Sequence, residues 1–269
     1  MIIVDHCYNN GRHQKILFIP PRQKTCNFRA PLLMLNSPQL FPAVFLRRYK
    51  RFFADIIDAH GNLMTIHCPN TGSMKNCQIE GSNCWYSLSD NPKRKLPGTL
   101  EIVTTSHGQL AGINTMRTNR LVAAALAINQ IPQFKGYDLV RSEVAYGSEK
   151  SRIDFLLKAT AGNLPDCYVE VKNVTLDMGN GLAMFPDSVT ARGTKHLREL
   201  IEMANLGYRA VLFFCVQLDV ADRIEVAADI DPLYAKTMEL AITKGVEVMA
   251  WRTMIDSNGI SLHQPIDCL

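Results

Sequence analysis

The sequence changes its pattern near residue 115, and this change limits the folds that the chain can adopt. Before it, short stretches that mix apolar and polar residues are separated by turns such as His60-Gly61-Asn62. These strand-like stretches lie at 45–56, 63–67, 83–89 and 100–104. Several short strands in succession predict a small β-barrel, for which the oligonucleotide-binding (OB) barrel is a natural candidate.

Beyond residue 115, helices and strands alternate. Helices are predicted at 119–130, which Thr118 could cap, at 194–205, which Gly207 ends, and at 232–244. The predicted strands lie at 139–146, 151–157, 167–174, 209–216 and 246–251. This order implies a mixed sheet with helices on its faces. The predicted fold class is therefore α/β (α+β), with a barrel followed by a mixed-sheet domain.

Residues 1–39 differ from both of these parts. They mix His, Asn, Cys, Arg and Pro without a helical or strand period. We therefore divide the chain into an irregular N-terminal extension at 1–39, an OB-like barrel at 40–115 and a mixed-sheet domain at 116–269. Met34 is an alternative initiator within the extension.

Charge is distributed unevenly along the chain. Residues 1–115 carry 13 Lys and Arg against 6 Asp and Glu, whereas residues 116–269 carry 16 against 19. A basic part joined to a slightly acidic one suggests that the basic part meets a polyanion. The alternative is the ordinary variation of surface charge.

Cysteine spacing and hydropathy indicate where the protein works. The eight cysteines include no C-x-x-C pair, so reduced, mostly buried thiols are expected rather than disulfides or a zinc site. The sequence has no apolar run long enough to span a bilayer, and its N-terminus is a poor signal peptide. We expect a cytoplasmic protein without a membrane partner. The glycines at 70–74 and 178–182 lack a phosphate-loop pattern, so a nucleotide cofactor is not expected.

One pair of predicted strands carries charged residues inside an apolar sequence. Asp154 lies within 151–157, and Glu170 and Lys172 lie within 167–174. Strand alternation puts Glu170 and Lys172 on the same face, and a hairpin can bring Asp154 beside them. Burying carboxylates in such strands costs free energy unless a cation or partner compensates. The pattern therefore favours a functional site over ordinary salt bridges on a solvated face.

Two carboxylates beside a lysine suit a hard cation such as Mg²⁺ or Mn²⁺. In phosphodiester hydrolysis, Asp154 and Glu170 would hold the metal. Lys172 would orient the attacking water or stabilise the transition state. Glu143, on the preceding strand, is a further candidate ligand, although nothing in the sequence fixes its face.

Two basic segments of the predicted barrel are candidates for contact with nucleic acid. The first combines charge for phosphates with rings for bases, and it consists of Arg47, Arg48, Tyr49, Lys50 and Arg51. Its alternative is a strand with aromatic residues in the core and solvated arginines. The second is an exposed turn flanked by prolines, and it consists of Lys93, Arg94 and Lys95.

Arg192, Lys195 and His196 open the second predicted helix. Basic groups at a helix start could steer a phosphate toward the metal, helped by the helix dipole. The alternative is a solvated helical face. Asn119 and Arg120, at the start of the first helix, face the site only if the expected topology holds.

From residue 41 to the end, the chain resembles the sugar fermentation stimulation protein A (SfsA) family. The matching stretches lie at 69–74, 89–95, 151–154, 169–176, 185–187, 192–197 and 229–232. The family is similar to the PD-(D/E)xK nucleases, with Asp154 as the first acid and Glu170-x-Lys172 as the second element, and its N-terminal part looks like an OB barrel.

The resemblance implies a DNA-binding protein linked to sugar (maltose) metabolism, with nuclease activity inferred from the fold. A metal-dependent nuclease is the leading hypothesis, because the acid, acid and lysine are all present. A non-catalytic DNA-binding regulator that uses the nuclease fold as a scaffold is the alternative. A homodimer would suit cleavage of both strands, although no motif indicates one.

Overall fold

The computed structural model describes residues 38–162, 164–256 and 259–268. They belong to one compact unit, Met34–Leu269. The extension predicted at 1–39 lies outside the described residues, apart from its last two positions.

The first part of the described chain is a closed five-stranded barrel, as predicted. Its strands are β1 (Leu40–Tyr49), β2 (Phe53–Asp58), β3 (Leu63–His67), β4 (Asn83–Leu88) and β5 (Gly98–Thr104). They follow the order β3-β2-β1-β4-β5, and a parallel pairing between β3 and β5 closes the barrel. Inward-facing residues fill the interior, among them the fully buried Phe45, Ile56 and Leu100.

The stretch at 45–56 forms two strands rather than one. The chain reverses at Lys50 and Arg51, whose φ angles are +46° and +64°. Glycine and asparagine usually mark such a left-handed turn, so two basic residues gave no turn signal in the sequence. The short β6 (Leu110–Gly112), which pairs with β5, was also not predicted.

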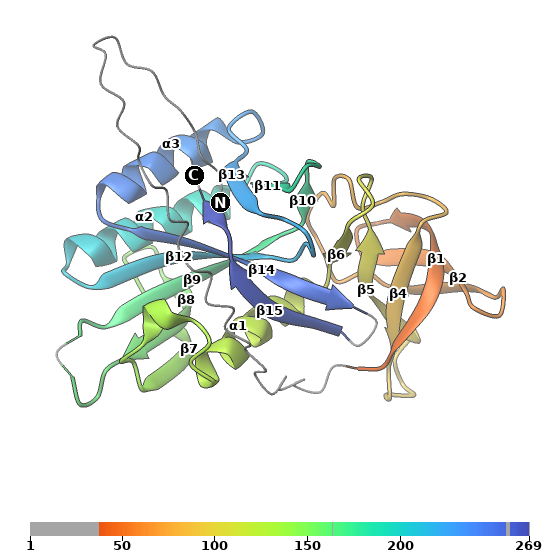
Figure 1. Cartoon of the computed structure of the whole chain (residues 1–269), viewed down its shortest axis with the longest axis horizontal. Coiled ribbons are helices and arrows are strands. Elements are labelled where there is room, and N and C mark those ends of the chain that lie inside the picture. Colours follow the sequence, from red (N-terminus) through yellow and green to blue (C-terminus); the bar gives the residue numbers. More distant parts are fainter. Residues whose placement is uncertain (1–37, 163, 257–258, 269) are drawn as a thin grey trace, which may run out of the picture. The chain divides into compact units, whose positions relative to one another are not determined.

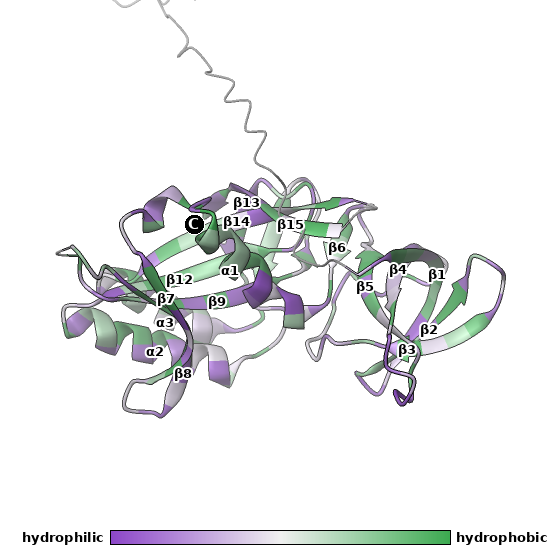
Figure 2. Ribbon diagram, turned by 90° about the horizontal axis from the view of Figure 1, so that it is seen from below, coloured by the Kyte–Doolittle hydropathy of each residue, from purple (hydrophilic) through white to green (hydrophobic). Residues whose placement is uncertain are grey.

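The second part is built on a six-stranded mixed sheet of order β15-β14-β12-β9-β8-β7. Its strands are β7 (Leu139–Tyr146), β8 (Ser151–Lys158), β9 (Cys167–Val174), β12 (Arg209–Val216), β14 (Glu247–Asp256) and β15 (Gly259–Pro265). The three central strands β9, β12 and β14 run parallel, and the outer strands pair antiparallel. Figure 2 colours β12 as hydrophobic, whereas β9 carries hydrophilic residues.

Helices cover both faces of this sheet (Figure 1). The helices are α1 (Thr118–Ala127), α2 (Ala191–Asn205) and α3 (Pro232–Thr243). Because side chains alternate along a strand, Val211 and Phe213 of β12 pack with α1. Leu212 and Phe214 face the other way and share a core with α2 and α3.

Short elements complete the fold. A four-stranded sheet of order β10-β11-β13-β16 consists of β10 (Leu176–Asp177), β11 (Leu182–Phe185), β13 (Arg223–Val226) and β16 (Asp267–Cys268). Two 3₁₀ turns, η1 (Thr115–Arg117) and η2 (Pro132–Phe134), flank α1. Strands of two to four residues are too short to show a period, so none of the four was predicted.

Backbone hydrogen bonds and a shared core join the barrel to the sheet. Gly112 N donates to Gln217 O at 3.0 Å, and Ala111 forms an antiparallel bridge with Leu218. The largest hydrophobic core contains Phe45 of the barrel together with Phe214 of the sheet. The two parts therefore share one interior.

Candidate metal centre

The centre of the site is an ion pair on β9. Glu170 and Lys172 project from the same face of this strand, and Lys172 Nζ lies 2.7 Å from Glu170 Oε1. Their side chains are only 3% and 11% exposed. The charges are thus held inside the protein, where water screens them little.

Asp154 reaches this centre from β8. The hydrogen-bonded ladder between β8 and β9 ends at the pair Phe155 and Val169, one position short of Asp154 and Glu170. Beyond that point, Val171 N donates to Asp154 Oδ2 at 2.7 Å. Asn119 Nδ2, at the start of α1, donates to Asp154 Oδ1, also at 2.7 Å. The carboxylate therefore stays fixed where the strands separate.

His196 on α2 completes the cluster. Its Nδ1 contacts Glu170 Oε1 and lies 3.1 Å from Lys172 Nζ, while Arg192 Nε donates to its Nε2 at 3.3 Å. Because Nε2 accepts this bond, the ring proton belongs on Nδ1, from which it is donated to Glu170. The sequence marked His196 only as a basic group at a helix start, since nothing local reveals a partner on β9.

The local start of α2 positions His196. Thr190 caps the helix by accepting a hydrogen bond from Gly193 N at 3.0 Å, and Asp231 accepts one from Thr190 N at 2.8 Å. This capping fixes the first turn, which carries Arg192. His196 follows on the same helical face, because residues four apart are neighbours.

The environment shifts the pKa values of the two carboxyl groups in opposite directions. Burial, reinforced by the charge of Glu170, raises the pKa of Asp154 from 3.8 to about 6. Burial also acts to raise the pKa of Glu170, but the hydrogen bond from His196 and the charge of Lys172 outweigh it and lower that pKa. Two ionised carboxylates at neutral pH then repel each other, which favours binding of a cation.

Three buried polar atoms beside this cluster lack a hydrogen-bond partner among the described residues. They are Glu170 Oε2, Tyr146 Oη and Tyr234 Oη. Burial and the nearby charge of Glu170 raise the pKa of both tyrosines, so their hydroxyls stay protonated. Unsatisfied buried groups of this kind point to a missing water or ion.

The donor set fits a hard divalent cation that keeps part of its hydration shell. Within the described segments no group of three or more His, Cys, Asp or Glu side chains is arranged to hold a metal. The site instead offers the carboxylates of Asp154 and Glu170, with Glu170 Oε2 unused. Mg²⁺ is commonly bound by one or two carboxylates, with waters and substrate phosphates in its other positions.

Glu143 lies next to Asp154 in the ladder between β7 and β8. The pairs Ser142 with Phe155 and Val144 with Ile153 flank these two residues. The Glu143 side chain is exposed, and its φ is +56°, a strained value for a residue within a strand. Its carbonyl accepts a hydrogen bond from Arg152 Nη1 at 2.7 Å.

The basic residues of β1 and its turn have different roles. Arg47 is 74% exposed, pairs with Asp55 at 2.8 Å and lies over the ring of Tyr49. Arg48 donates to the carbonyls of Asn70 and Gly72, so its charge is committed to the protein. Tyr49 also stacks on Phe53, with ring centroids 5.4 Å apart. The turn residues Lys50 and Arg51 are exposed.

The remaining predicted cations lie on two other elements. Lys93, Arg94 and Lys95 are exposed on the turn before β5, and Arg94 Nη2 donates to Thr99 Oγ1 at 2.9 Å. On α2, Arg192 contacts His196, whereas Lys195 Nζ donates to the carbonyl of Glu149. Of the two helix cations, only Arg192 therefore touches the cluster.

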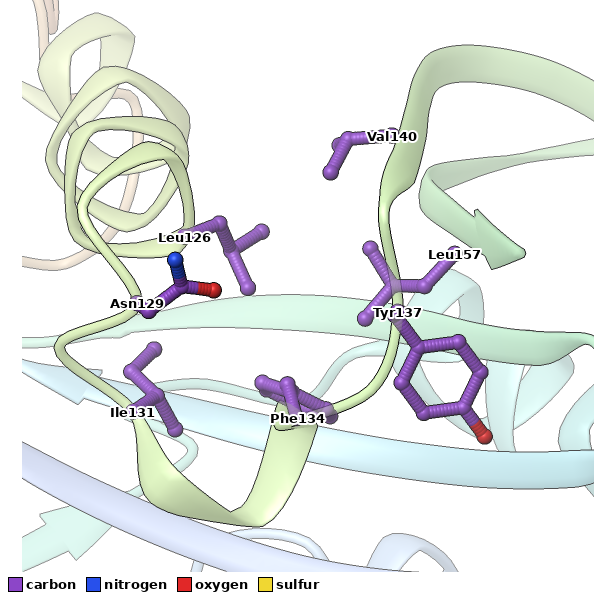
Figure 3. Close-up of a pocket in the computed structure, with 7 residues that line it drawn as sticks. All are labelled: Leu126, Asn129, Ile131, Phe134, Tyr137, Val140 and Leu157. Carbon is purple, nitrogen blue, oxygen red and sulfur yellow. The ribbon is translucent and has the colours of Figure 1, made fainter. Parts of the chain in front are cut away.

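A small apolar cavity lies away from this centre (Figure 3). It lies between the end of α1 and the edge strand β7, and it is lined by Leu126, Asn129, Ile131, Phe134, Tyr137, Val140 and Leu157. Its volume of about 10 Å³ is room for about one water molecule. The Tyr137 hydroxyl points away from it and donates to Pro165 O, so the cavity offers no ligand site.

The cysteines and helices show two further features. The six cysteines that lie within the described residues form no disulfide, and all but Cys268 are buried. No helix in the described segments combines the length and the apolar character that crossing a membrane requires.

Comparison with known proteins gives matches over most of the chain. A family model described as "Sugar fermentation stimulation protein RE domain" matches residues 116–259. A second, described as "SfsA N-terminal OB domain", matches residues 46–113.

Curated relatives and a solved structure agree with these models. The sugar fermentation stimulation protein homolog of Pseudomonas entomophila is 50% identical over 88% of this chain and 99% of its own length. The homolog of Shewanella frigidimarina is 49% identical over 84% and 95%. A solved structure of Pyrococcus furiosus SfsA, in complex with Ca²⁺, has a TM-score of 0.76 at 26% identity and covers 87% of this chain and 96% of that one.

Proposed function

Because this chain belongs to the sugar fermentation stimulation protein family, we propose that it binds DNA and hydrolyses phosphodiester bonds as a metal-dependent nuclease. The observation that carries this proposal is the buried centre itself. Asp154, Glu170 and Lys172 converge there, and no described residue forms a hydrogen bond with Glu170 Oε2. Burying these charges costs free energy that an apolar core would not cost, so the cluster is better explained by function than by stability.

Each residue of the centre has a defined task in this reaction. Asp154 and Glu170 would hold Mg²⁺ or Mn²⁺, and the bound cation supplies activation of water and offsets charge on the phosphate oxygens. Asn119 and Val171 N fix the Asp154 carboxylate. Lys172 holds a positive charge where the negative charge of the transition state develops.

The Pyrococcus furiosus relative supports a hard cation in this family. The description of its structure names Ca²⁺, which binds through oxygen ligands as Mg²⁺ does. His196, which occupies Glu170 Oε1, leaves Oε2 as the free ligand atom.

The barrel supplies candidate groups for gripping DNA. Arg47, Lys50 and Arg51 are exposed on the β1–β2 hairpin, beside the stacked rings of Tyr49 and Phe53. Lys93 and Lys95 add exposed charge on a second turn. Charged groups with neighbouring rings suit phosphates and bases of a single strand, and we expect affinity to fall steeply as salt rises.

The test is cleavage of labelled single-stranded, duplex and branched DNA and of RNA in Mg²⁺ or Mn²⁺. We expect wild-type cleavage, and a loss of about 100-fold or more in Lys172→Ala and Glu170→Gln. Lys236→Ala, at an exposed position of α3, is the matched control and should cleave normally.

The second candidate is a non-catalytic DNA-binding regulator of sugar (maltose) metabolism, which the description of the family as a sugar fermentation stimulation protein favours. In that case no substrate of the panel is cleaved while salt-sensitive binding of DNA remains. Cleavage that is equal in wild type and Lys172→Ala would instead point to a contaminating nuclease and remove support for the proposed centre.

A further inference from the structure

A cavity of about 250 Å³ with a mixed polar and apolar lining lies at the end of β9, the strand that carries Glu170 and Lys172. One wall comes from residues 70–72, which follow β3 of the barrel, and the opposite wall comes from β9, β10 and β11 of the sheet domain. Asn173, which lines it, directly follows Lys172 on β9. Although the Asn173 side chain projects from the other face of β9, it accepts a hydrogen bond from Thr118, and the next residue, Asn119, binds Asp154. The cavity and the centre are therefore linked through the start of α1.

The barrel loop is fixed against the sheet domain at the rim of this cavity. Asp187 accepts hydrogen bonds from Ser73 Oγ at 3.0 Å and from Met74 N at 3.1 Å. Gly72 packs so closely that an added Cβ would lie 2.8 Å from Asp187 Oδ2. The contacts of Arg48 with the carbonyls of Asn70 and Gly72 hold the loop from its other side. The cavity is thus largely preformed, as ligand sites usually are.

Its lining offers hydrogen-bond donors. Asn173 Oδ1 already accepts from Thr118 and Gln217, and Asn70 Oδ1 accepts from Gly72 N. The amide NH₂ groups of both asparagines therefore remain as donors toward a ligand.

The rest of the lining decides which part of a nucleic acid fits. The described residues that line the cavity include no Lys or Arg, and Asp187 gives it a carboxylate, which would repel a phosphate. Leu176, Met184 and Phe185 give it an apolar wall. A flat, neutral ring with a polar edge matches this combination of donors, carboxylate and apolar surface.

We propose that this cavity receives one unstacked nucleobase of the strand whose phosphate lies at the metal centre. The inference rests on the proposed function and extends it by naming a single-base subsite. A cavity of this size is smaller than the roughly 300 Å³ at which pockets for drug-sized ligands begin, so it holds one base rather than a stacked run. Enzymes that take a base out of the stack read its edge with such polar groups.

The test is a set of labelled 20-nucleotide strands, single and duplex, in which an abasic site occupies each position in turn. Affinity of the full chain is measured in Ca²⁺ and cleavage in Mg²⁺. We expect a loss of about 10-fold or more at one position at a fixed offset from the cleaved phosphate, because one base contact is removed. A 2-aminopurine base at that position should gain fluorescence on binding.

The matched variants are Thr71→Trp and Ala59→Trp. Thr71 is exposed and lines the cavity, so an indole can fill it without disturbing the core, whereas Ala59 is exposed on the distant β2–β3 turn. In Thr71→Trp the affinity should no longer depend on the position of the abasic site, whereas in Ala59→Trp it should depend on that position as in the wild type. If the wild type binds all the abasic strands with the same affinity, which we call a flat series, the proposal is overturned. A flat series with millimolar binding of free nucleosides also overturns it, in favour of a small-molecule site.

The two proposals fail separately. If no substrate is cleaved but the abasic series and the 2-aminopurine signal single out one position, the base subsite stands and the nuclease fails. If cleavage depends on Lys172 but the abasic series is flat, the nuclease stands and the subsite fails.

Discussion

At the scale of single residues, the buried charges of the site lower the stability of the folded protein. Asp154 and Glu170 are both withdrawn from water, and only Lys172, His196 and hydrogen bonds compensate them. Burying charges in this way lowers the stability of the folded protein. Removing the charge of Asp154, whose pKa is raised, should therefore stabilise the protein, whereas removing either member of the Glu170–Lys172 pair should destabilise it, because the other charge stays buried.

The raised pKa of Asp154 predicts a pH-dependent gain in stability for Asp154→Asn. With a pKa of about 6 in the folded protein against an ordinary 3.8, the folded state binds the proton more tightly than the unfolded chain does. Stability is therefore lost as pH rises from about 4 to about 6. Asparagine removes the charge, and Asn119 can turn its amide to keep the hydrogen bond. Without metal at pH 8 we expect the variant to be about 1–2 kcal/mol more stable.

Urea unfolding in EDTA at pH 4 and pH 8 checks this prediction. The advantage of the variant should be much smaller at pH 4, where Asp154 is protonated in the folded wild type and about half protonated in the unfolded chain. Mg²⁺ should raise the Tm of the wild type and leave the variant unchanged. An equal stability difference at both pH values would contradict the assignment of the shift to Asp154.

Replacing His196 should lower the affinity of the site for a cation. Because it holds Glu170 Oε1, its loss should free the carboxylate to rotate and weaken Mg²⁺ binding by about 10–100-fold. Calorimetric titration of Mg²⁺ into His196→Ala measures this, and His196→Gln, which keeps a donor, should recover part of the affinity. His60→Ala, at an exposed turn, should bind as the wild type does.

At the scale of elements, sequence pattern predicted what is long and periodic. The ranges expected for α1, α2, α3 and the strands β7, β8, β9 and β12 differ from those observed by only a few residues. The alternation of Glu170 and Lys172 follows directly from strand geometry. His196 was named without its partner, because the contact joins α2 to β9 and depends on packing. The Lys50–Arg51 turn was missed because its residues are not turn formers.

One buried carboxylate links the starts of two helices. Asp231 caps α3 by accepting from Tyr234 N at 3.0 Å, and its other oxygen accepts from Thr190 N, just before α2. Asp231→Ala removes both bonds and should destabilise the protein by about 2–3 kcal/mol. Urea unfolding measures the loss. Asp90→Ala, on an exposed turn, should change stability by less than about 0.5 kcal/mol.

At the scale of the whole molecule, the junction between barrel and sheet is packed as tightly as a core. Gln217 touches both sides, because its carbonyl accepts from Gly112 N and its side chain donates to Thr118 and Asn173. Asn173 lies beside Lys172 on β9. Hydrogen bonds therefore join the barrel to Asn173, the residue next to Lys172 in β9, a link that no sequence pattern reveals.

Gly112 is the closest approach in this junction. An added Cβ would meet the Gln217 side chain and lie 2.7 Å from Ile260 Cδ1. Gly112→Ala should therefore destabilise the protein by about 1–3 kcal/mol through overpacking. Thermal unfolding checks this against Gly162→Ala, where the added Cβ meets nothing closer than 3.5 Å. Equal Tm values for the two variants would show that the side chains at the junction move to accommodate the added methyl group without loss of stability.

The interior that the barrel and the sheet share has a consequence for how the chain comes apart. Phe45 and Leu100 of the barrel belong to the same core as Leu197 and Phe214 of the sheet domain. Unfolding of either part would therefore expose apolar residues of the other to water. We therefore expect the described residues to unfold in one cooperative transition, although their sequence suggests two modules. A barrel expressed alone would expose the apolar face that the sheet domain covers, and we expect it to aggregate.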